Sequence, residues 1–175
     1  DSFVEARAKA PAPQSTSGLA SRSVPHDRMR LKIAEHMLNS VTQAPHVTAV
    51  FEADFSAIAV HREAHKAEFA ARGIKLTYTA YLVAAAAEAM RVAPEINSRW
   101  HPDRLELFED INIGVGTALG RKGLIVPVLR QVQQLSLEGI AAGLDRLVKK
   151  ARAEELTGAD VSGGTFTISN HGVSG

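Results

Sequence analysis

The chain has 175 residues, 45% of them hydrophobic, which is enough for one domain with a packed core. Its 20 Lys and Arg residues nearly balance its 19 Asp and Glu residues, which argues against a nucleic-acid-binding protein, because such proteins carry a basic excess. The chain contains no cysteine, and this excludes a disulfide framework, a thiol nucleophile and cysteine-ligated zinc.

The N-terminal segment differs in composition from the rest. Residues 1–23 are rich in Ala, Pro, Ser and charged side chains and predict a linker, with a folded domain over residues 24–175. We find no signal peptide and no uncharged apolar run of about 18 residues, so no membrane span is predicted. Because the first residue is Asp1 rather than Met, we expect that an upstream segment has been removed.

The first half of the domain predicts a helix and then a strand. Met29, Ile33 and Met37 recur at helical spacing after Asp27, a residue suited to a helix start. Residues 46–55 alternate between apolar and polar side chains, which predicts a half-buried strand.

The rest of the chain mixes helices and strands without strict alternation. The predicted elements are a helix from Ser56 to Gly73, a buried helix from Thr77 to Pro94, strands over 111–118 and 124–129, a helix after the N-cap Ser136, and a strand over 164–169. The residues LGRKG join the two middle strands as a hairpin, and Pro127 indicates an edge or a bulge in the second. This order predicts an α+β fold or a mixed sheet.

Two motifs suggest chemistry that their spacing does not support. His61 and His65 share a helical face, but Glu63 does not directly follow the first histidine as the zincin pattern requires. With no third ligand evident, we predict a solvated helix face and no metal site. In GVGTALG, Leu119 stands where a dinucleotide-binding loop needs its third glycine, so the glycines are expected to permit close backbone approach in a strand.

Four blocks of the sequence resemble a known family. VPHDRMRLKIAEHML, PHVTAVFEAD, INIGVGTALGRKGLIVPVLRQV and LTGADVSGGTFTISNHGVSG are similar, in the same order and at similar spacing, to the catalytic domain of the E2 component of 2-oxo acid dehydrogenase complexes, the dihydrolipoamide acyltransferases. The resemblance covers residues 24–175. Residues 1–23 resemble the Ala/Pro-rich linker that precedes this domain in the family.

The resemblance implies a fold, an activity and an assembly. The fold is chloramphenicol-acetyltransferase-like, a mixed sheet flanked by helices, in homotrimers that build a cubic or dodecahedral core. The activity is acyl transfer between the lipoyl dithiol and coenzyme A. The lipoyl group belongs to an upstream domain, and upstream domains also bind the E1 and E3 components. The location expected is the bacterial cytoplasm or, less favoured, the mitochondrial matrix.

The resemblance also implies site residues. The family stabilises the tetrahedral oxyanion with a Ser or Thr hydroxyl in an F-T-[IV]-[ST] block, and that position is Ser169. The general base is the His of an H-x-x-x-D-G motif, which does not occur in these 175 residues, so we expect this chain alone to be inactive. His171 is better interpreted as a turn residue than as a substitute base. Asn97 also matches a family block and is a candidate for substrate binding, although an amide at a helix end often only caps the turn.

Two alternatives stay open. The chain could be a non-catalytic core subunit of such a complex, because the base is absent from the sequence. It could also be a chloramphenicol-type O-acetyltransferase, although a free-standing enzyme of that kind needs no linker. The acyl group, whether acetyl, succinyl or branched-chain, and the core symmetry are not readable from the sequence.

Overall fold

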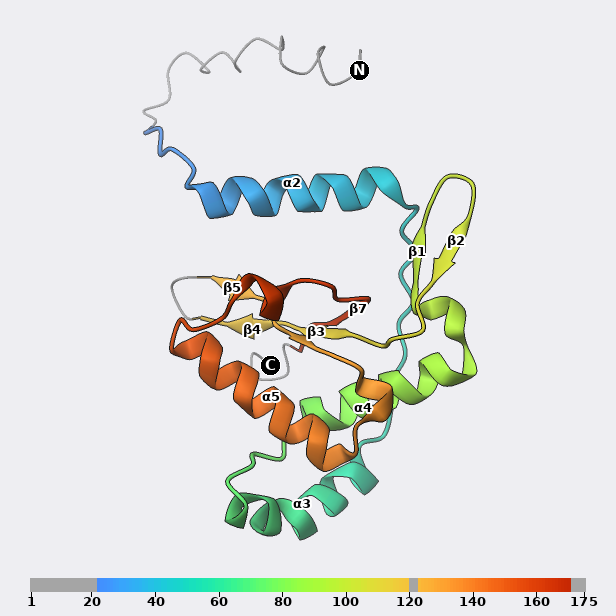
Figure 1. Ribbon diagram of the computed structural model, residues 1–175, viewed down its shortest axis with the longest axis vertical. Coiled ribbons are helices and arrows are strands. Elements are labelled where there is room, and N and C mark those ends of the chain that lie inside the picture. The colour runs from blue at the N-terminus through green and yellow to red at the C-terminus, as the bar shows by residue number, and fades with distance from the viewer. Residues whose placement is uncertain (1–21, 120–122, 171–175) are drawn as a thin grey trace. The chain divides into compact units, whose positions relative to one another are not determined.

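The computed structural model describes residues 22–119 and 123–170. The chain divides between Thr42 and Gln43 into two units. Nearly all of the predicted linker lies outside the described residues. The helices and strands, in chain order, are α2 (Arg28–Gln43), α3 (Ser56–Ala71), α4 (Tyr78–Val92), the 3-10 turn η1 (Pro94–Ile96), β1 (Ser98–Trp100), β2 (Leu105–Leu107), β3 (Ile113–Val115), β4 (Thr117–Ala118), β5 (Leu124–Ile125), β6 (Val128–Leu129), η3 (Val132–Gln134), α5 (Leu137–Arg152), η4 (Gly158–Val161) and β7 (Phe166–Ile168) (Figure 1).

The first predicted helix is confirmed as α2. The Asp27 carboxylate accepts a hydrogen bond from the Arg30 backbone N–H at 2.7 Å, which caps the first turn. None of its residues is buried, and the apolar stripe of Met29, Ile33 and Met37 is exposed. No helix in the described ranges is long and apolar enough to cross a membrane.

The predicted strand over residues 46–55 is wrong. These residues form no regular element, and Val47 and Phe51 are 94% and 89% exposed. Alternation fixes which side chains share a face, but a strand also needs a neighbouring backbone to pair with. Among the strands that the structure describes, none pairs with this segment.

The next two predicted helices are confirmed as α3 and α4, and both begin and end close to the predicted residues. After α3, Gly73 has a φ of +74°, the left-handed conformation that glycine adopts at little cost just past a helix end. Thr77 is extended and α4 begins at the next residue. Pro94 then starts η1 instead of continuing α4.

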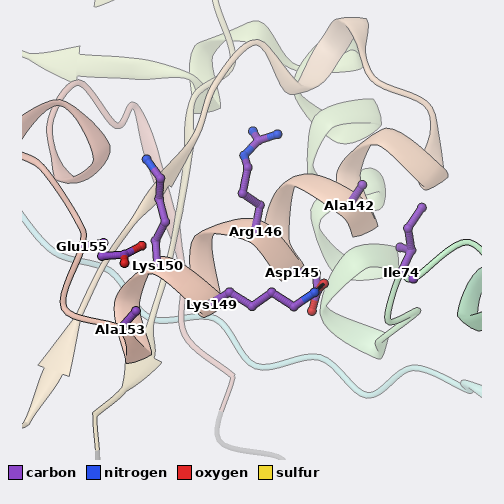
Figure 2. A pocket seen from close by; sticks show the side chains of 9 residues that line it. Ile74, Ala142, Asp145, Arg146, Lys149, Lys150, Ala153 and Glu155 are labelled. Carbon is purple, nitrogen blue, oxygen red and sulfur yellow. Dashed lines mark ion pairs between the residues drawn. The ribbon is translucent and has the colours of Figure 1, made fainter.

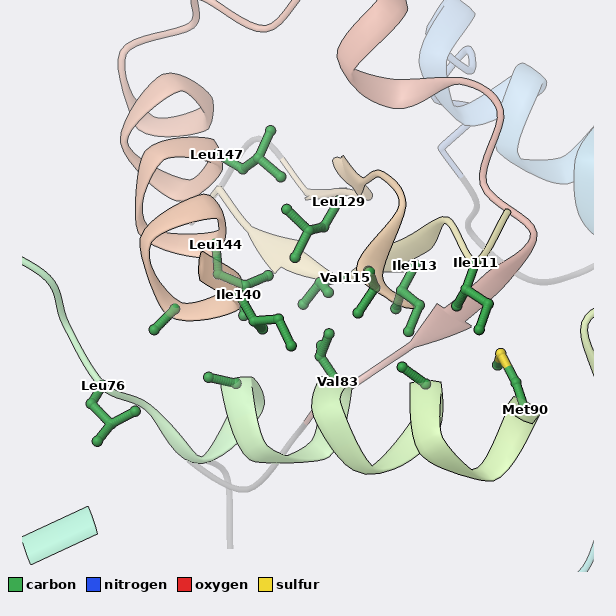
Figure 3. Packing of buried hydrophobic residues seen from close by; sticks show 14 of the residues in the cluster. Leu76, Val83, Met90, Ile111, Ile113, Val115, Leu129, Ile140, Leu144 and Leu147 are labelled. Carbon is green, nitrogen blue, oxygen red and sulfur yellow. The ribbon is translucent and has the colours of Figure 1, made fainter. Parts of the chain in front are cut away.

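A three-stranded sheet organises the core, in the order β6-β3-β7. β3 pairs antiparallel with β6 and parallel with β7. Within Gln43–Gly175, α4 and α5 lie on the same side of these strands (Figure 1). Figure 3 shows apolar side chains from both helices pointing toward the strand residues, and the cluster includes Val83, Met90, Ile113, Val115, Leu129, Ile140, Leu144 and Leu147.

The hairpin predicted around LGRKG is confirmed. β4 and β5 pair antiparallel, and the Leu119 N–H donates to the Gly123 carbonyl at 2.8 Å. Pro127 lies between β5, which pairs with β4, and β6, which pairs with β3. Its carbonyl still accepts from the Val115 N–H at 2.9 Å, so the proline interrupts the strand without removing that bond.

α5 begins as predicted and packs unusually close to the sheet. The Ser136 hydroxyl caps the helix by accepting from the Gly139 N–H at 3.2 Å. A Cβ placed on Gly143 would lie 2.5 Å from a methyl group of Leu129 on β6. The glycine therefore permits this helix–strand contact.

Candidate active site

The parallel pairing of β3 with β7 determines the position of Ser169. The register pairs Gly114 with Thr167 and Val115 with Ile168. One residue further, Gly116 lies beside Ser169, and the Gly116 N–H donates to the Ile168 carbonyl at 2.9 Å. Two segments more than fifty residues apart in sequence are thereby fixed against each other.

Ser169 belongs to the face of the sheet that does not enter the core. Successive strand residues point to opposite faces, so Thr167 and Ser169 lie opposite to Phe166 and Ile168, which pack against the core cluster. A Cβ placed on Gly116 would lie 3.7 Å from Ser169 Oγ. We call the surface formed by Gly114, Gly116, Thr167 and Ser169 the Ser169 face; both of its hydroxyl residues are exposed.

The sequence predicted that the glycines of this strand permit close backbone approach, and at Gly114 the close neighbour is a side chain. A Cβ on Gly114 would lie 2.8 Å from a methyl group of Val126 and 3.5 Å from Thr167 Oγ1. Such a short distance to a side-chain carbon shows that β3 has no room for a larger residue there without a shift. Around Gly116 the nearest atoms lie at 3.7 Å, an ordinary van der Waals distance.

The segment that leads into β7 is held by hydrogen bonds to residues that are distant in the sequence. The Thr165 N–H donates to the Asn112 carbonyl at 2.8 Å, and the Asn112 N–H donates to Thr165 Oγ1 at 3.1 Å. Arg130 donates through Nη2 to the carbonyls of Ala159 at 2.8 Å and Ser162 at 2.9 Å. This arginine is a positioning residue that the sequence analysis did not single out.

A capping box at η4 completes this support. The Asp160 carboxylate accepts from both the N–H and the hydroxyl of Thr157 at 2.8 Å. These bonds, with a smaller contribution from Lys150 at 3.3 Å, hold the pKa of Asp160 below its usual range.

Asn97 lies at the other end of β3 from Ser169. It is 2% exposed, and its Nδ2 donates to the carbonyls of Phe108 at 2.8 Å and Asp110 at 3.1 Å. At about 3.3 Å per residue, the extended chain from Ile111 to Gly116 spans roughly 16 Å, so the two predicted site residues are not adjacent. His171 lies outside the described residues.

Asn97 retains one free acceptor in a hollow. No donor among the described residues reaches its buried Oδ1. The side chain helps to line a hollow of about 580 Å³, together with apolar residues such as Met90 and Ile111 and the charged residues Arg91 and Glu109.

A second hollow lies along α5 and contains neither predicted site residue. Its lining includes Arg146, Lys149, Lys150 and Glu155, and Figure 2 shows Lys149 lying along the helix toward Asp145, with which it pairs at 2.6 Å. In the part of the chain that the structure describes, no three or more His, Asp or Glu residues are grouped to hold a metal ion.

Comparison with known proteins decides the family. The model of the 2-oxoacid dehydrogenases acyltransferase (catalytic domain) family matches residues 19–175. The chain belongs to this family. Among members of the acyltransferase family, the lipoamide acyltransferase component of the branched-chain alpha-keto acid dehydrogenase complex of Bacillus subtilis is 33% identical over 96% of the chain. The dihydrolipoyllysine-residue succinyltransferase component of the 2-oxoglutarate dehydrogenase complex of Rickettsia bellii is 35% identical over 95%.

Solved structures show the same fold. A probable dihydrolipoamide acetyltransferase from Listeria monocytogenes is 34% identical, with a TM-score of 0.82 over 89% of this chain and 66% of that one. The dihydrolipoamide acetyltransferase of Azotobacter vinelandii, studied for the roles of a serine, a histidine and an asparagine in its mechanism, is 32% identical, with a TM-score of 0.85 over 95% of this chain and 69% of that one. The predicted α+β fold of E2 cores is therefore confirmed.

The match covers only part of the relatives. The chain spans 43% of the length of the Bacillus subtilis protein and 44% of the Rickettsia bellii protein. The residues that carry the family resemblance are therefore those of a catalytic domain within longer proteins.

Proposed function

We propose that the complete protein transfers an acyl group between the dihydrolipoamide of a lipoyl domain and coenzyme A, as the structural and catalytic core of a 2-oxo acid dehydrogenase complex. Membership of the acyltransferase family supports the reaction class. Relatives with branched-chain, succinyl and acetyl names match at 33%, 35% and 37% identity, so their names favour no single acyl group.

The β3–β7 register is the observation that carries the proposal. It sets the Ser169 hydroxyl beside a glycine, on a face that the core does not use. A hydroxyl there can rotate to donate a hydrogen bond to a negative charge that develops only in the transition state. Gly116 adds no side chain beside this hydroxyl.

The proposed reaction is a thioester exchange. The sulfur of deprotonated coenzyme A attacks the carbonyl carbon of the acyl-dihydrolipoamide, and the carbonyl π electrons move to oxygen as a C–S bond forms. Ser169 donates its hydrogen bond to this oxyanion. When the oxyanion collapses, the C–S bond to the lipoyl sulfur breaks, and the leaving thiolate takes up the proton removed from coenzyme A.

The proton transfer needs a base, because a free thiol has a pKa of about 8.5. We assign this role to the His of the family's H-x-x-x-D-G motif, in a part of the protein outside this sequence and on a neighbouring subunit. A homotrimer within a cubic or dodecahedral core is the proposed assembly, with a lipoyl domain and the E1 and E3 components recruited by upstream domains. The proposed location is the cytoplasm.

Asn97 stays a candidate for substrate binding. The two hydrogen bonds that its side-chain amide donates go to the loop that leads into β3, which supports a positioning role. Its Oδ1 could still accept from an amide N–H of either long thiol substrate. If Asn97 binds substrate, Asn97→Ala raises the KM of the folded enzyme, whereas a purely positioning role leaves KM unchanged and lowers stability.

Replacing Ser169 tests the proposed reaction. In the enzyme encoded by the complete gene, Ser169→Ala is expected to lower kcat by roughly 10²–10³, or about 2.7–4 kcal/mol, with little change in KM, because the lost bond forms only in the transition state. The measurement is steady-state acyl transfer from acyl-CoA to dihydrolipoamide. Ser162→Ala, in the exposed turn before β7, is the matched control and should retain full activity.

Two other results would change the proposal. An unchanged kcat in Ser169→Ala would remove Ser169 from the mechanism. A complete protein with no transferase activity that still assembles would instead support the non-catalytic core subunit.

A further inference from the structure

The residue that follows Ser169 makes a long-range contact that the proposed reaction leaves unused. Asn170 donates from its side-chain Nδ2 to Thr79 Oγ1 at 3.2 Å. The two residues are 91 positions apart in the sequence, and Thr79 lies in the first turn of α4. This hydrogen bond therefore ties the chain just beyond β7 to the start of a helix. The sequence analysis assigned a role to neither residue.

The alternation of β7 agrees with this contact. Ile168 packs against the core cluster, and Ser169 belongs to the opposite face. Continuing the alternation by one residue returns the Asn170 side chain to the core side, where α4 lies. Ala80 and Val83 of this helix are fully buried, so α4 is a firmly packed anchor for the bond.

Ser169 is thus held through both of its chain neighbours. Before it, the Ile168 carbonyl accepts from the Gly116 N–H at 2.9 Å, and after it the Asn170 side chain is bonded to Thr79. These two contacts fix the direction of the backbone from which the Ser169 hydroxyl projects.

The proposed role of Ser169 makes this direction important. An oxyanion donor has to lie about 2.7–3.1 Å from the place where the charge develops, and its support has to hold it there within about 0.5 Å. A misplacement of about 1 Å can lower a rate by roughly a hundredfold. A contact that limits the movement of Ser169 can therefore contribute to the rate without touching substrate.

We propose that Asn170 is a positioning residue for the Ser169 hydroxyl, with Thr79 as its anchor on α4. This inference rests on the proposed function, because Asn170 acts on the reaction only through Ser169. The pairing of β7 with β3 does not depend on the Asn170 side chain, so the strand keeps its register when this side chain is removed.

Steady-state acyl transfer by the enzyme encoded by the complete gene tests this proposal. Asn170→Ala and Thr79→Val each remove the bond, and each is expected to lower kcat by about tenfold with little change in KM, because the substrate contacts are kept. Thr79→Ser retains a hydroxyl and should keep the parent kcat. Thr77→Val is the matched control, since it makes the same change two residues earlier at a hydroxyl that forms no capping hydrogen bond, and it should also keep the parent kcat.

A double-variant comparison separates positioning from a general loss of structure. In the Ser169→Ala background, Asn170→Ala should lower kcat no further, because no hydroxyl is left to position. A merely structural role would lower kcat by the same factor in both backgrounds. Thr79→Val, which changes the side-chain volume little, provides the same comparison if Asn170→Ala fails to fold.

The outcomes distinguish this role from the proposed reaction. If Ser169→Ala loses activity but Asn170→Ala and Thr79→Val retain the parent kcat, or if the losses multiply in the double variant, the role of Asn170 alone is overturned. An unchanged kcat in Ser169→Ala overturns the proposed reaction and the role of Asn170 together.

Discussion

Two segments with the same alternating pattern have opposite structures. Residues 46–55 and 164–169 each alternate between apolar and polar side chains, yet the first forms no element and the second contains β7. The difference lies outside the two segments, because β7 has β3 beside it and 46–55 has no pairing strand in the described residues. A period of two therefore predicts a strand only where the chain also supplies a partner.

The largest expected effect contrasts a side chain of β3, the strand that pairs with β7, with a side chain of residues 46–55. Ile113 on β3 is fully buried, whereas Val47 is 94% exposed. Ile113→Ala should lower the free energy of unfolding by about 2–5 kcal/mol, since it leaves a cavity in the core cluster. Val47→Ala should change it by no more than about 0.5 kcal/mol. Urea denaturation measures both, and similar losses in the two variants would contradict the contrast.

The local signals in the sequence predicted the ends of helices and the hairpin. Asp27, Gly73 and Ser136 act through residues within one turn, so their roles follow from spacing alone. The β1–β2 hairpin was missed because its strands are three residues long, too short for a period to be recognised. The turn residues Pro102 and Asp103 between them were the available signal.

The site was predictable only in part. The family resemblance indicated Ser169, but its neighbour Gly116 depends on the parallel register, which no local pattern encodes. The carbonyls that Arg130 holds lie 29 and 32 residues further on, and those that Asn97 holds lie 11 and 13 residues further on. Contacts at these separations arise from the tertiary fold.

Arg130 anchors the turn that leads into β7. Removing its side chain should therefore weaken β7, the strand that residues 164–169 form and residues 46–55 do not. Arg130→Ala is expected to cost about 1–2 kcal/mol of unfolding free energy, because it removes two charge-assisted hydrogen bonds at an exposed site. Arg91→Ala removes only an exposed ion pair on α4 and should cost less than about 0.5 kcal/mol. Hydrogen exchange should show the added loss of protection at β7 in Arg130→Ala, and uniform exchange changes would count against an anchoring role.

The two glycines of the Ser169 face should separate activity from stability. Gly116→Ala adds a methyl group at ordinary contact distance beside Ser169 Oγ, so the fold should tolerate it while kcat falls by about tenfold or more. Gly114→Ala, with 2.8 Å to a Val126 methyl group, should instead cost about 1–3 kcal/mol of stability. Thermal unfolding and acyl-transfer assays of both variants of the complete enzyme test this division. Equal kcat for Gly116→Ala and the parent would show that the methyl group does not obstruct the hydroxyl.

The smallest effect concerns pH at the turn before β7. Bonds from Thr157 hold the pKa of Asp160 below its unfolded value of about 3.9, so its ionised form stabilises the folded state at neutral pH. That contribution is complete above the unfolded pKa and is lost as the pH falls through the lower, folded pKa. The stability difference between the parent and Asp160→Asn should therefore shrink between pH 5 and about pH 3. Other carboxylates with lowered pKa values, such as Glu106, titrate in both proteins and cancel in this difference. A difference that stays constant over this range would mean that the Asp160 charge adds nothing to the turn that positions β7.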